Sequence, residues 1–155
     1  MSKNFLCVLF KFAIVVCAIC GICICGCFYP FLVSLNGWGK GSEVVMWTQI
    51  IFYWGTSIPW FWLLWIAWRV ASSMKLELFT LQNARLLKNG AILLFVDSVI
   101  FLFGNLIFMF MGYNPFAIAF FLLVIVSLIA SLALGAMGYY VAKASALREE
   151  NESYV

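Results

Sequence analysis

Residues 116–142 read FAIAFFLLVIVSLIASLALGAMGYYVA and contain no charged side chain. A helix that crosses the hydrocarbon of a bilayer needs about 20 predominantly apolar residues. All backbone hydrogen bonds of such a helix form within the segment itself, because lipid offers no partners. This stretch is therefore predicted to be a transmembrane helix.

Three further stretches of the same kind lie upstream, at 12–35, 44–68 and 91–111. Turn-forming or charged residues fill the breaks between the four spans, at 36–41, 69–90 and 112–115. The last break is so short that the third and fourth spans must form an antiparallel hairpin. We therefore expect an all-α polytopic membrane protein whose residues 1–155 form one four-helix transmembrane domain.

The composition supports this class of protein and argues against others. The chain has 155 residues, of which 66% are hydrophobic and 10% are charged, whereas soluble domains average roughly 45–50% and about 25%. Such a chain is too apolar for a soluble domain, a disordered segment or a nucleic-acid-binding module. Four spans also leave no room for a soluble catalytic domain, so we expect no enzymatic activity, no cofactor and no direct binding of nucleic acid.

Lysine and arginine are distributed unevenly among the connections, and positively charged segments resist translocation. Lys40 alone falls on one side of the predicted spans, so we expect both termini and the 69–90 connection in the cytoplasm. The protein would then be a multi-pass protein of a bacterial cytoplasmic membrane, and Trp65 and Trp68 would mark the cytoplasmic interface. The basic residues on the cytoplasmic side are Lys3, Lys11, Arg69, Lys75, Arg85, Lys88, Lys143 and Arg148.

Asp97 is the only charged residue inside the 44–68, 91–111 and 116–142 spans. An ionised carboxylate in hydrocarbon costs roughly 2.5–3.5 kcal/mol, so Asp97 should face the protein interior, form a pair or carry a proton. Helical spacing places it on one face with Ser98, Gly104 and Asn105, and we expect that face to point inward. Two interpretations stay open: a structural residue paired with a cation, or an intramembrane functional site formed by Asp97 and Asn105. The cations considered for pairing are Lys11, Arg69 and Lys143.

Two spans contain residues that shape helices and their packing. Pro59 removes one backbone donor and predicts a kink, with Thr56 and Ser57 available to satisfy the carbonyl left free near Gly55. The fourth span has small residues at helical spacing, a pattern that lets a neighbouring helix approach closely. That neighbour is either in the same chain or in another copy, as in a homo-oligomer. The small residues are Ser127, Ser131, Gly135, Gly138 and Ala142.

Five of the six cysteines lie in the first span. Cys17, Cys20 and Cys23 have C-x-x-C spacing, which fits thiol redox chemistry or binding of a soft metal such as Cu(I). Thiol exchange would need a second cysteine pair outside the bilayer, and the sequence has none. The alternative interpretation is that cysteine serves as a small apolar residue in helix packing.

The two cytoplasmic segments are predicted to extend the helices that they adjoin. Thr80 is a plausible N-cap for a helix that runs into the third span, and the tail 143–155 should prolong the fourth. We expect Asn83 on the polar side of the new helix, with Gln82, Arg85 and Asn89. The candidate contacts for a cytoplasmic partner are Thr80, Asn83, Arg85, Lys88, Arg148, Glu149, Glu150 and Asn151.

These two segments resemble a bacterial family of four-span membrane proteins of unknown function. Members have a Phe-Ser/Thr-x-x-Asn-x-x-x-Leu-basic segment before the third span, matched here from Phe79, and a Leu-basic-acid-Glu-Asn-Asp ending, matched from Leu147. Glu152 stands in place of the final aspartate, and neither the last three residues nor the cysteine-rich first span follows the family pattern. The resemblance implies a small helix-turn-helix regulator as partner, because such genes often lie beside one that encodes it.

Three hypotheses of function follow. The first is a regulatory or protective membrane component that engages a cytoplasmic partner, such as a helix-turn-helix protein, through 69–90 and the tail. The second is a small proton-coupled transporter or exporter that uses Asp97. The third is a membrane protein that handles thiols or metals through the cysteines of the first span.

Overall fold

The computed structural model describes residues 3–28, 31, 43–73, 80–112 and 117–153, and every regular element in these ranges is helical. Four helices are long and apolar enough to cross a membrane, which confirms the four predicted spans and the all-α class. Residues 29, 30 and 32–35 of the expected first span lie outside the described residues. The elements are α1 (Lys3–Cys23), the π-helix η1 (Ile24–Phe28), α3 (Glu43–Ser73), α4 (Leu81–Phe110) and α5 (Ala117–Ser153).

The helices extend further than the spans predicted from hydropathy. Residues 69–73 still belong to α3 and residues 81–90 already belong to α4, so most of the expected 69–90 connection is helical. As predicted, α4 begins at an N-cap: Thr80 has extended backbone angles, and its side chain accepts a hydrogen bond from the Asn83 amide at 3.2 Å. The fourth helix also continues into the tail, as far as Ser153.

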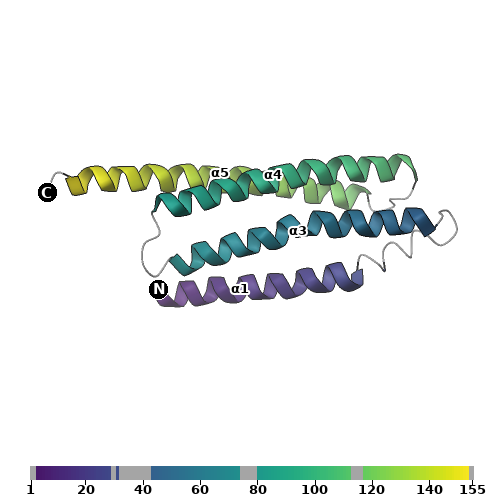
Figure 1. The fold of residues 1–155 in the computed structure, drawn as a ribbon, viewed down its shortest axis with the longest axis horizontal. Coiled ribbons are helices and arrows are strands. Elements are labelled where there is room, and N and C mark those ends of the chain that lie inside the picture. Colours follow the sequence, from purple (N-terminus) through teal and green to yellow (C-terminus); the bar gives the residue numbers. More distant parts are fainter. Residues whose placement is uncertain (1–2, 29–30, 32–42, 74–79, 113–116, 154–155) are drawn as a thin grey trace.

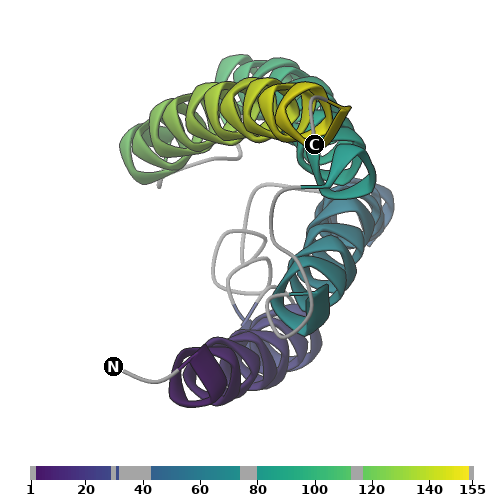
Figure 2. The same cartoon turned by 90° about the vertical axis from the view of Figure 1, so that its left-hand side faces the viewer.

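The four helices lie side by side in chain order and form a curved row (Figure 1, Figure 2). Among the described residues, close backbone approaches occur only between helices that follow one another: α1 with α3, α3 with α4, and α4 with α5. Seen along the helices in Figure 2, the row is an open arc with a concave and a convex face. Both chain termini lie at the same end (Figure 1).

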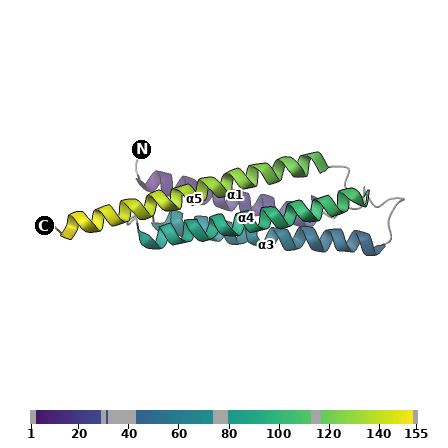
Figure 3. The same ribbon diagram turned by 90° about the horizontal axis from the view of Figure 1, so that it is seen from above.

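The closest pairing in the row joins α4 to α5, which run alongside each other over most of their length (Figure 3). Ser131 donates a hydrogen bond of 2.8 Å to the Ala91 carbonyl across this interface. A Cβ built on Gly138 would lie 3.2 Å from the Ala84 carbonyl oxygen and from the Lys88 nitrogen. The small-residue pattern of the fourth span therefore packs against α4 of the same chain, which answers the question that the sequence leaves open.

The interface between α1 and α3 follows a spacing of alternately four and three residues, which is the pattern of a coiled-coil seam. The Cys7 thiol donates to the Ala71 carbonyl at 3.2 Å near one end, and the Trp54 indole donates to the Cys25 carbonyl at 2.9 Å near the other. Between them, the Trp60 ring occupies the place where a side chain on Gly21 would lie. The positions of this seam on α1 are less exposed than their neighbours and comprise Cys7, Lys11, Ile14, Ala18, Gly21 and Cys25.

An aromatic cluster joins α3, α4 and α5. Tyr53 stacks on Phe120 with ring centroids 5.6 Å apart, and Phe101 meets Phe120 edge-on at 5.7 Å. Asn105 is buried beside these rings: its amide donates to the Phe101 carbonyl at 2.7 Å, and its oxygen accepts from the Tyr53 hydroxyl at 3.5 Å. This cluster supports α3 against the α4–α5 pair.

The third helix bends at the predicted place, because α3 contains Pro59 and changes direction near its middle (Figure 1). The expected compensation takes a different form. Ser57 and Thr56 donate to the Tyr53 carbonyl at 2.7 and 3.1 Å, and the described bonds include none from either hydroxyl to Gly55. A hydroxyl in a helix reaches back three or four residues, so both reach past Gly55, whose carbonyl Pro59 leaves free.

Candidate functional site

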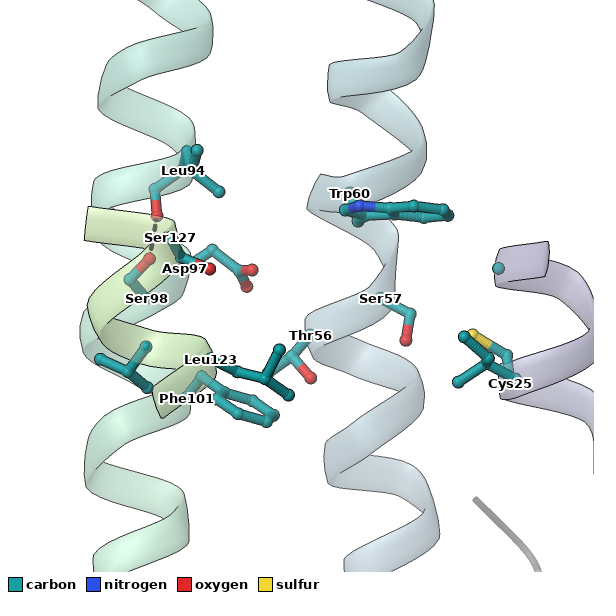
Figure 4. A pocket seen from close by; sticks show the side chains of 13 residues that line it. Cys25, Thr56, Ser57, Trp60, Leu94, Asp97, Ser98, Phe101, Leu123 and Ser127 are labelled. Atoms are coloured by element: carbon teal, nitrogen blue, oxygen red, sulfur yellow. Dashed lines mark hydrogen bonds between the residues drawn. The ribbon is translucent and has the colours of Figure 1, made fainter. Parts of the chain in front are cut away.

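A cavity of about 390 Å³ lies where all four helices contribute side chains (Figure 4). It is formed by the end of α1 and the start of η1, by the bend region of α3, and by the middle of α4 and α5. Seen along their axes, the described helices form an arc (Figure 2), and each of them contributes residues to the cavity lining. Its lining residues are Gly21, Ile24, Cys25, Thr56, Ser57, Trp60, Leu94, Asp97, Ser98, Phe101, Leu123, Val124 and Ser127.

Asp97 supplies the charged group of this cavity. Its carboxylate projects from α4 into the space towards α3 (Figure 4), and the residue is half-buried. Within the described part of the chain, its side chain makes no hydrogen bond and no ion pair. A carboxyl group that faces a cavity at mid-span without a protein partner is available for a ligand or a proton.

The cations that we considered for pairing with Asp97 are placed elsewhere. Lys11 lies over the Trp68 ring with its nitrogen 4.9 Å from the centroid, and the Arg69 guanidinium lies 5.0 Å from the centroid of Trp65. Lys143 is exposed on α5. None of the three forms an ion pair with Asp97 among the described residues, and Lys11 and Arg69 lie over aromatic rings at the end of α3 instead.

Hydroxyl groups of α3, α4 and α5 line the cavity together with Asp97. Ser98 donates to the Leu94 carbonyl at 2.7 Å, and Thr56 and Ser57 also donate to their own helix. These three hydroxyls thus present oxygen lone pairs as acceptors on the cavity wall, whereas Ser127 of α5 makes no hydrogen bond among the described residues. Together with Asp97 they give the cavity a wall of hydrogen-bond acceptors.

Two aromatic side chains form the apolar part of the cavity lining. Trp60 lines the cavity and points from α3 towards α1 (Figure 4), where its ring fits against Gly21 and any larger side chain would collide with it. Phe101 lines the cavity from α4 (Figure 4) and belongs at the same time to the aromatic cluster. The site thus combines one carboxylate, several acceptor oxygens and two aromatic faces.

The predicted inward face of the third span is confirmed, although its members have separate roles. Ser98 and Asn105 are each 3% exposed, and the Phe52 ring packs directly over Gly104. Asp97 and Ser98 line the cavity, whereas Asn105 lies outside its lining and is held in the aromatic cluster. Trp60, Thr56 and Ser57 were not predicted as site residues. They could have been found as a tryptophan and two hydroxyl residues that lie beside Pro59 in the middle of a span.

The cysteines of the first span do not gather into a site. Cys17, Cys20 and Cys23 are exposed on α1, and the one buried cysteine is Cys7. Among the described residues no three histidine, cysteine, aspartate or glutamate side chains come together to hold a metal. The packing interpretation fits Cys7 and Cys25, which lie on the α1–α3 seam, whereas Cys17, Cys20, Cys23 and Cys27 are exposed and make no such contact with α3.

The candidate partner contacts divide into buried and exposed residues. Thr80 is half-buried as the N-cap. Asn83 is only 4% exposed and donates to the Ser73 hydroxyl at 2.7 Å, so its predicted place on the polar side of the helix is wrong. The reason is local: the end of α3 packs beside the start of α4, and Asn83 ties the two together. The exposed candidates are Arg85, Lys88, Arg148, Glu149, Glu150 and Asn151.

Replacing Asn83 with alanine is expected to lower the free energy of unfolding by about 1 kcal/mol, because it removes a buried hydrogen bond between α3 and α4. Chemical denaturation in detergent micelles would measure this change. Gln82→Ala is the matched control, since Gln82 is the exposed neighbour on the same helix turn. Equal stability of the two variants would contradict a structural role for Asn83.

Four helices of membrane-spanning length around one cavity define a polytopic integral membrane protein. The chain belongs to the family described as "Protein of unknown function (DUF2975)", whose sequence profile matches residues 40–155. This match confirms the predicted family resemblance, and the cysteine-rich helix α1 lies outside the matched residues. No curated protein and no solved structure matches the chain.

Proposed function

We propose that this protein binds a lipophilic monovalent cation in the Asp97 cavity and carries it across the cytoplasmic membrane in exchange for a proton. The observation that supports the proposal is the Asp97 carboxylate, which faces a cavity of about 390 Å³ and has no partner among the described residues. The proposed orientation has both termini in the cytoplasm. It is supported by the uneven distribution of basic residues and by the position of the termini at one end (Figure 1).

The chemistry of the lining favours a cation of this kind. A single carboxylate balances one positive charge, and a bound cation removes the cost of an unpaired charge in hydrocarbon. Trp60 and Phe101 offer aromatic faces, which attract cations and pack against apolar groups. Thr56, Ser57 and Ser98 offer acceptor oxygens for a ligand N–H group. The volume also lies within the range of about 300–1,000 Å³ that is typical of small-molecule sites.

Exchange with a proton follows from the same carboxyl group. Asp97 can hold a proton or face a cation, and either state keeps the cavity close to neutral. A cation that binds therefore displaces the proton from the Asp97 oxygen, and a proton that binds releases the cation. The proposal involves no covalent step, in line with the expectation that the chain is not an enzyme.

The proposal is tested with tetraphenylphosphonium as the probe cation. Purified protein should bind it more weakly as the pH falls, because protons compete for Asp97, and proteoliposomes should accumulate it when a pH gradient is imposed. Tetraphenylborate is the matched control, since it has nearly the same size and shape but the opposite charge. Binding of the anion as tightly as the cation, or no binding of the cation, would refute the proposal.

A second candidate function is regulation through a cytoplasmic partner, such as a small helix-turn-helix protein. It is favoured by the extension of α5 past the neighbouring helices at the end where the termini lie (Figure 3), and by the exposed charged residues there. Arg85 and Lys88 on α4 and Glu149 on α5 would contact the partner. The protein would then transmit the state of its membrane domain to that partner.

A photo-crosslinking amino acid at position 85 or 149 is expected to capture a small DNA-binding protein in native membranes, identified by mass spectrometry. Position 132 is the matched control, because Leu132 is 72% exposed on the apolar part of α5. Crosslinks from 85 and 149 only to other copies of this chain would count against the regulatory function.

A further inference from the structure

The ends of α1 and α3 carry two cations on aromatic rings. Lys11 of α1 lies over Trp68, 4.9 Å from the ring centroid, and Arg69 of α3 lies over Trp65 at 5.0 Å. The Cys7 thiol donates to the Ala71 carbonyl in the same region and fixes the two helices against each other. Two positive groups from neighbouring helices are therefore held in a defined arrangement.

Neither cation is neutralised within the described part of the chain, where Lys11 and Arg69 form no ion pair and no hydrogen bond. Because no hydrogen bond among the described residues uses the guanidinium N–H groups of Arg69, they stay available as a planar fork. Such a fork matches the oxygens of a phosphate, with which arginine forms two parallel hydrogen bonds. The arrangement is thus suited to a phosphate group.

An apolar groove of about 330 Å³ lies between the same two helices, deeper in the membrane domain. Its lining includes Ile22 on α1 and Ile58 on α3. Ile58, Trp65 and Arg69 follow at spacings of seven and four, and Lys11, Val15 and Ile22 at spacings of four and seven. Each set therefore lies along one helix face. At 1.5 Å per residue, the groove starts about 12 Å from Arg69, at Phe61, and about 17 Å from Lys11, at Ile22.

We propose that Lys11 and Arg69 bind the phosphate of an anionic phospholipid, such as phosphatidylglycerol, whose acyl chain lies in the groove between α1 and α3. Tryptophan side chains are enriched at the depth of the headgroups, which places Trp65 and Trp68 at the level that the phosphate occupies. Basic pockets between transmembrane helices on the cytoplasmic side are suited to such headgroups. The groove favours a phospholipid over a free phosphate ester, because a free ester has no apolar chain to fill the groove.

The groove adjoins the Asp97 cavity, because Cys25 and Ser57 line both. Asp97 and Trp60 line only the cavity, whereas Ile22, Trp54 and Ile58 line only the groove. The phospholipid proposal uses Lys11, Arg69 and the groove, and does not rest on the proposed transport. The bound lipid would hold α1 on α3, because the phosphate bridges one side chain from each helix.

Native mass spectrometry of the delipidated protein in detergent tests the proposal. The added probes are phosphatidylglycerol, phosphatidylcholine with the same acyl chains, and glycerol phosphate. We expect phosphatidylglycerol to bind at least about tenfold more tightly than phosphatidylcholine, and glycerol phosphate at the same concentration not to displace it. Equal binding of the two lipids would overturn the proposal. Displacement by glycerol phosphate would overturn it as well, in favour of a soluble phosphate ester.

The double variant Lys11→Gln/Arg69→Gln should lose at least about tenfold in affinity for phosphatidylglycerol, because both charge-assisted contacts disappear. Lys88→Gln/Lys143→Gln is the matched control, which removes the same charge from two exposed positions. An equal loss in the control would overturn the proposal in favour of diffuse attraction. Arg69→Lys keeps the charge without the fork and should bind with intermediate affinity, so the test does not depend on folding of the double variant.

Discussion

Replacing Asp97 with asparagine is expected to weaken the binding of tetraphenylphosphonium strongly and to abolish its proton-driven uptake. Asparagine has almost the same size but carries neither a negative charge nor an exchangeable carboxyl proton. A charge-assisted contact is worth about 1.5–3 kcal/mol, and each 1.4 kcal/mol is a factor of ten, so the affinity should fall roughly ten- to a hundredfold. The folded state should persist, because the Asp97 side chain makes no hydrogen bond within the described residues.

Two further variants test whether the carboxyl group of Asp97 or another feature of the cavity is responsible for binding and uptake. Asp97→Glu keeps the carboxyl group and should retain measurable uptake, while Ser98→Ala removes a hydroxyl that already donates to the Leu94 carbonyl and should retain most of the binding. The measurements are equilibrium binding in detergent and accumulation in proteoliposomes under the same pH gradient. An asparagine variant that accumulates the cation at the parental rate would rule out the transport proposal.

Replacing Gly138 with leucine is expected to separate α4 from α5 and to give the largest loss of stability. A Cβ at this position would already lie 3.2 Å from two backbone atoms of α4, the Ala84 oxygen and the Lys88 nitrogen. Backbone atoms of a helix cannot turn aside as a side chain can, so the helices must move apart. Overpacking of this kind costs about 1–3 kcal/mol or more, and the hydrogen bond from Ser131 to Ala91 would be lost with it.

Gly55→Leu is the matched control for this experiment, because a Cβ built on Gly55 meets nothing within 4 Å. Chemical denaturation in detergent micelles should show a clear loss of stability for the Gly138 variant and little change for the Gly55 variant. Equal effects at the two positions would mean that the cost comes from losing a glycine and not from the contact with α4.

Hydropathy and helical spacing predict most of the fold. The four spans, the Thr80 cap and the inward face with Asp97 all depend on local patterns, since periodicity and capping are properties of neighbouring residues. The small residues on α5 could be predicted to form a contact surface. The helix that packs on them could not be predicted, because the same pattern allows close approach of a helix of the same chain or of another copy.

The features that escaped prediction depend on which helices meet. Asn83 is polar and lies in the predicted 69–90 connection, so we expected it to face solvent. It is buried because the end of α3 lies beside the start of α4. Lys11 and Arg69 were expected to be able to reach Asp97 with their long side chains, yet they lie over Trp68 and Trp65. The cavity likewise depends on residues from all the helices, so no single helix encodes it.

The placement of the helices in chain order bears on how the protein assembles. Each helix has its closest backbone contacts with the one made just before or just after it, so these contacts have low sequence separation. Topologies built from such local contacts lose little conformational entropy on loop closure, so they form quickly. As the chain is synthesised, α3 can dock on α1 and α4 on α3 without displacing an earlier pair, and α5 then closes the most intimate interface last. The order of synthesis is thus also a workable order of assembly.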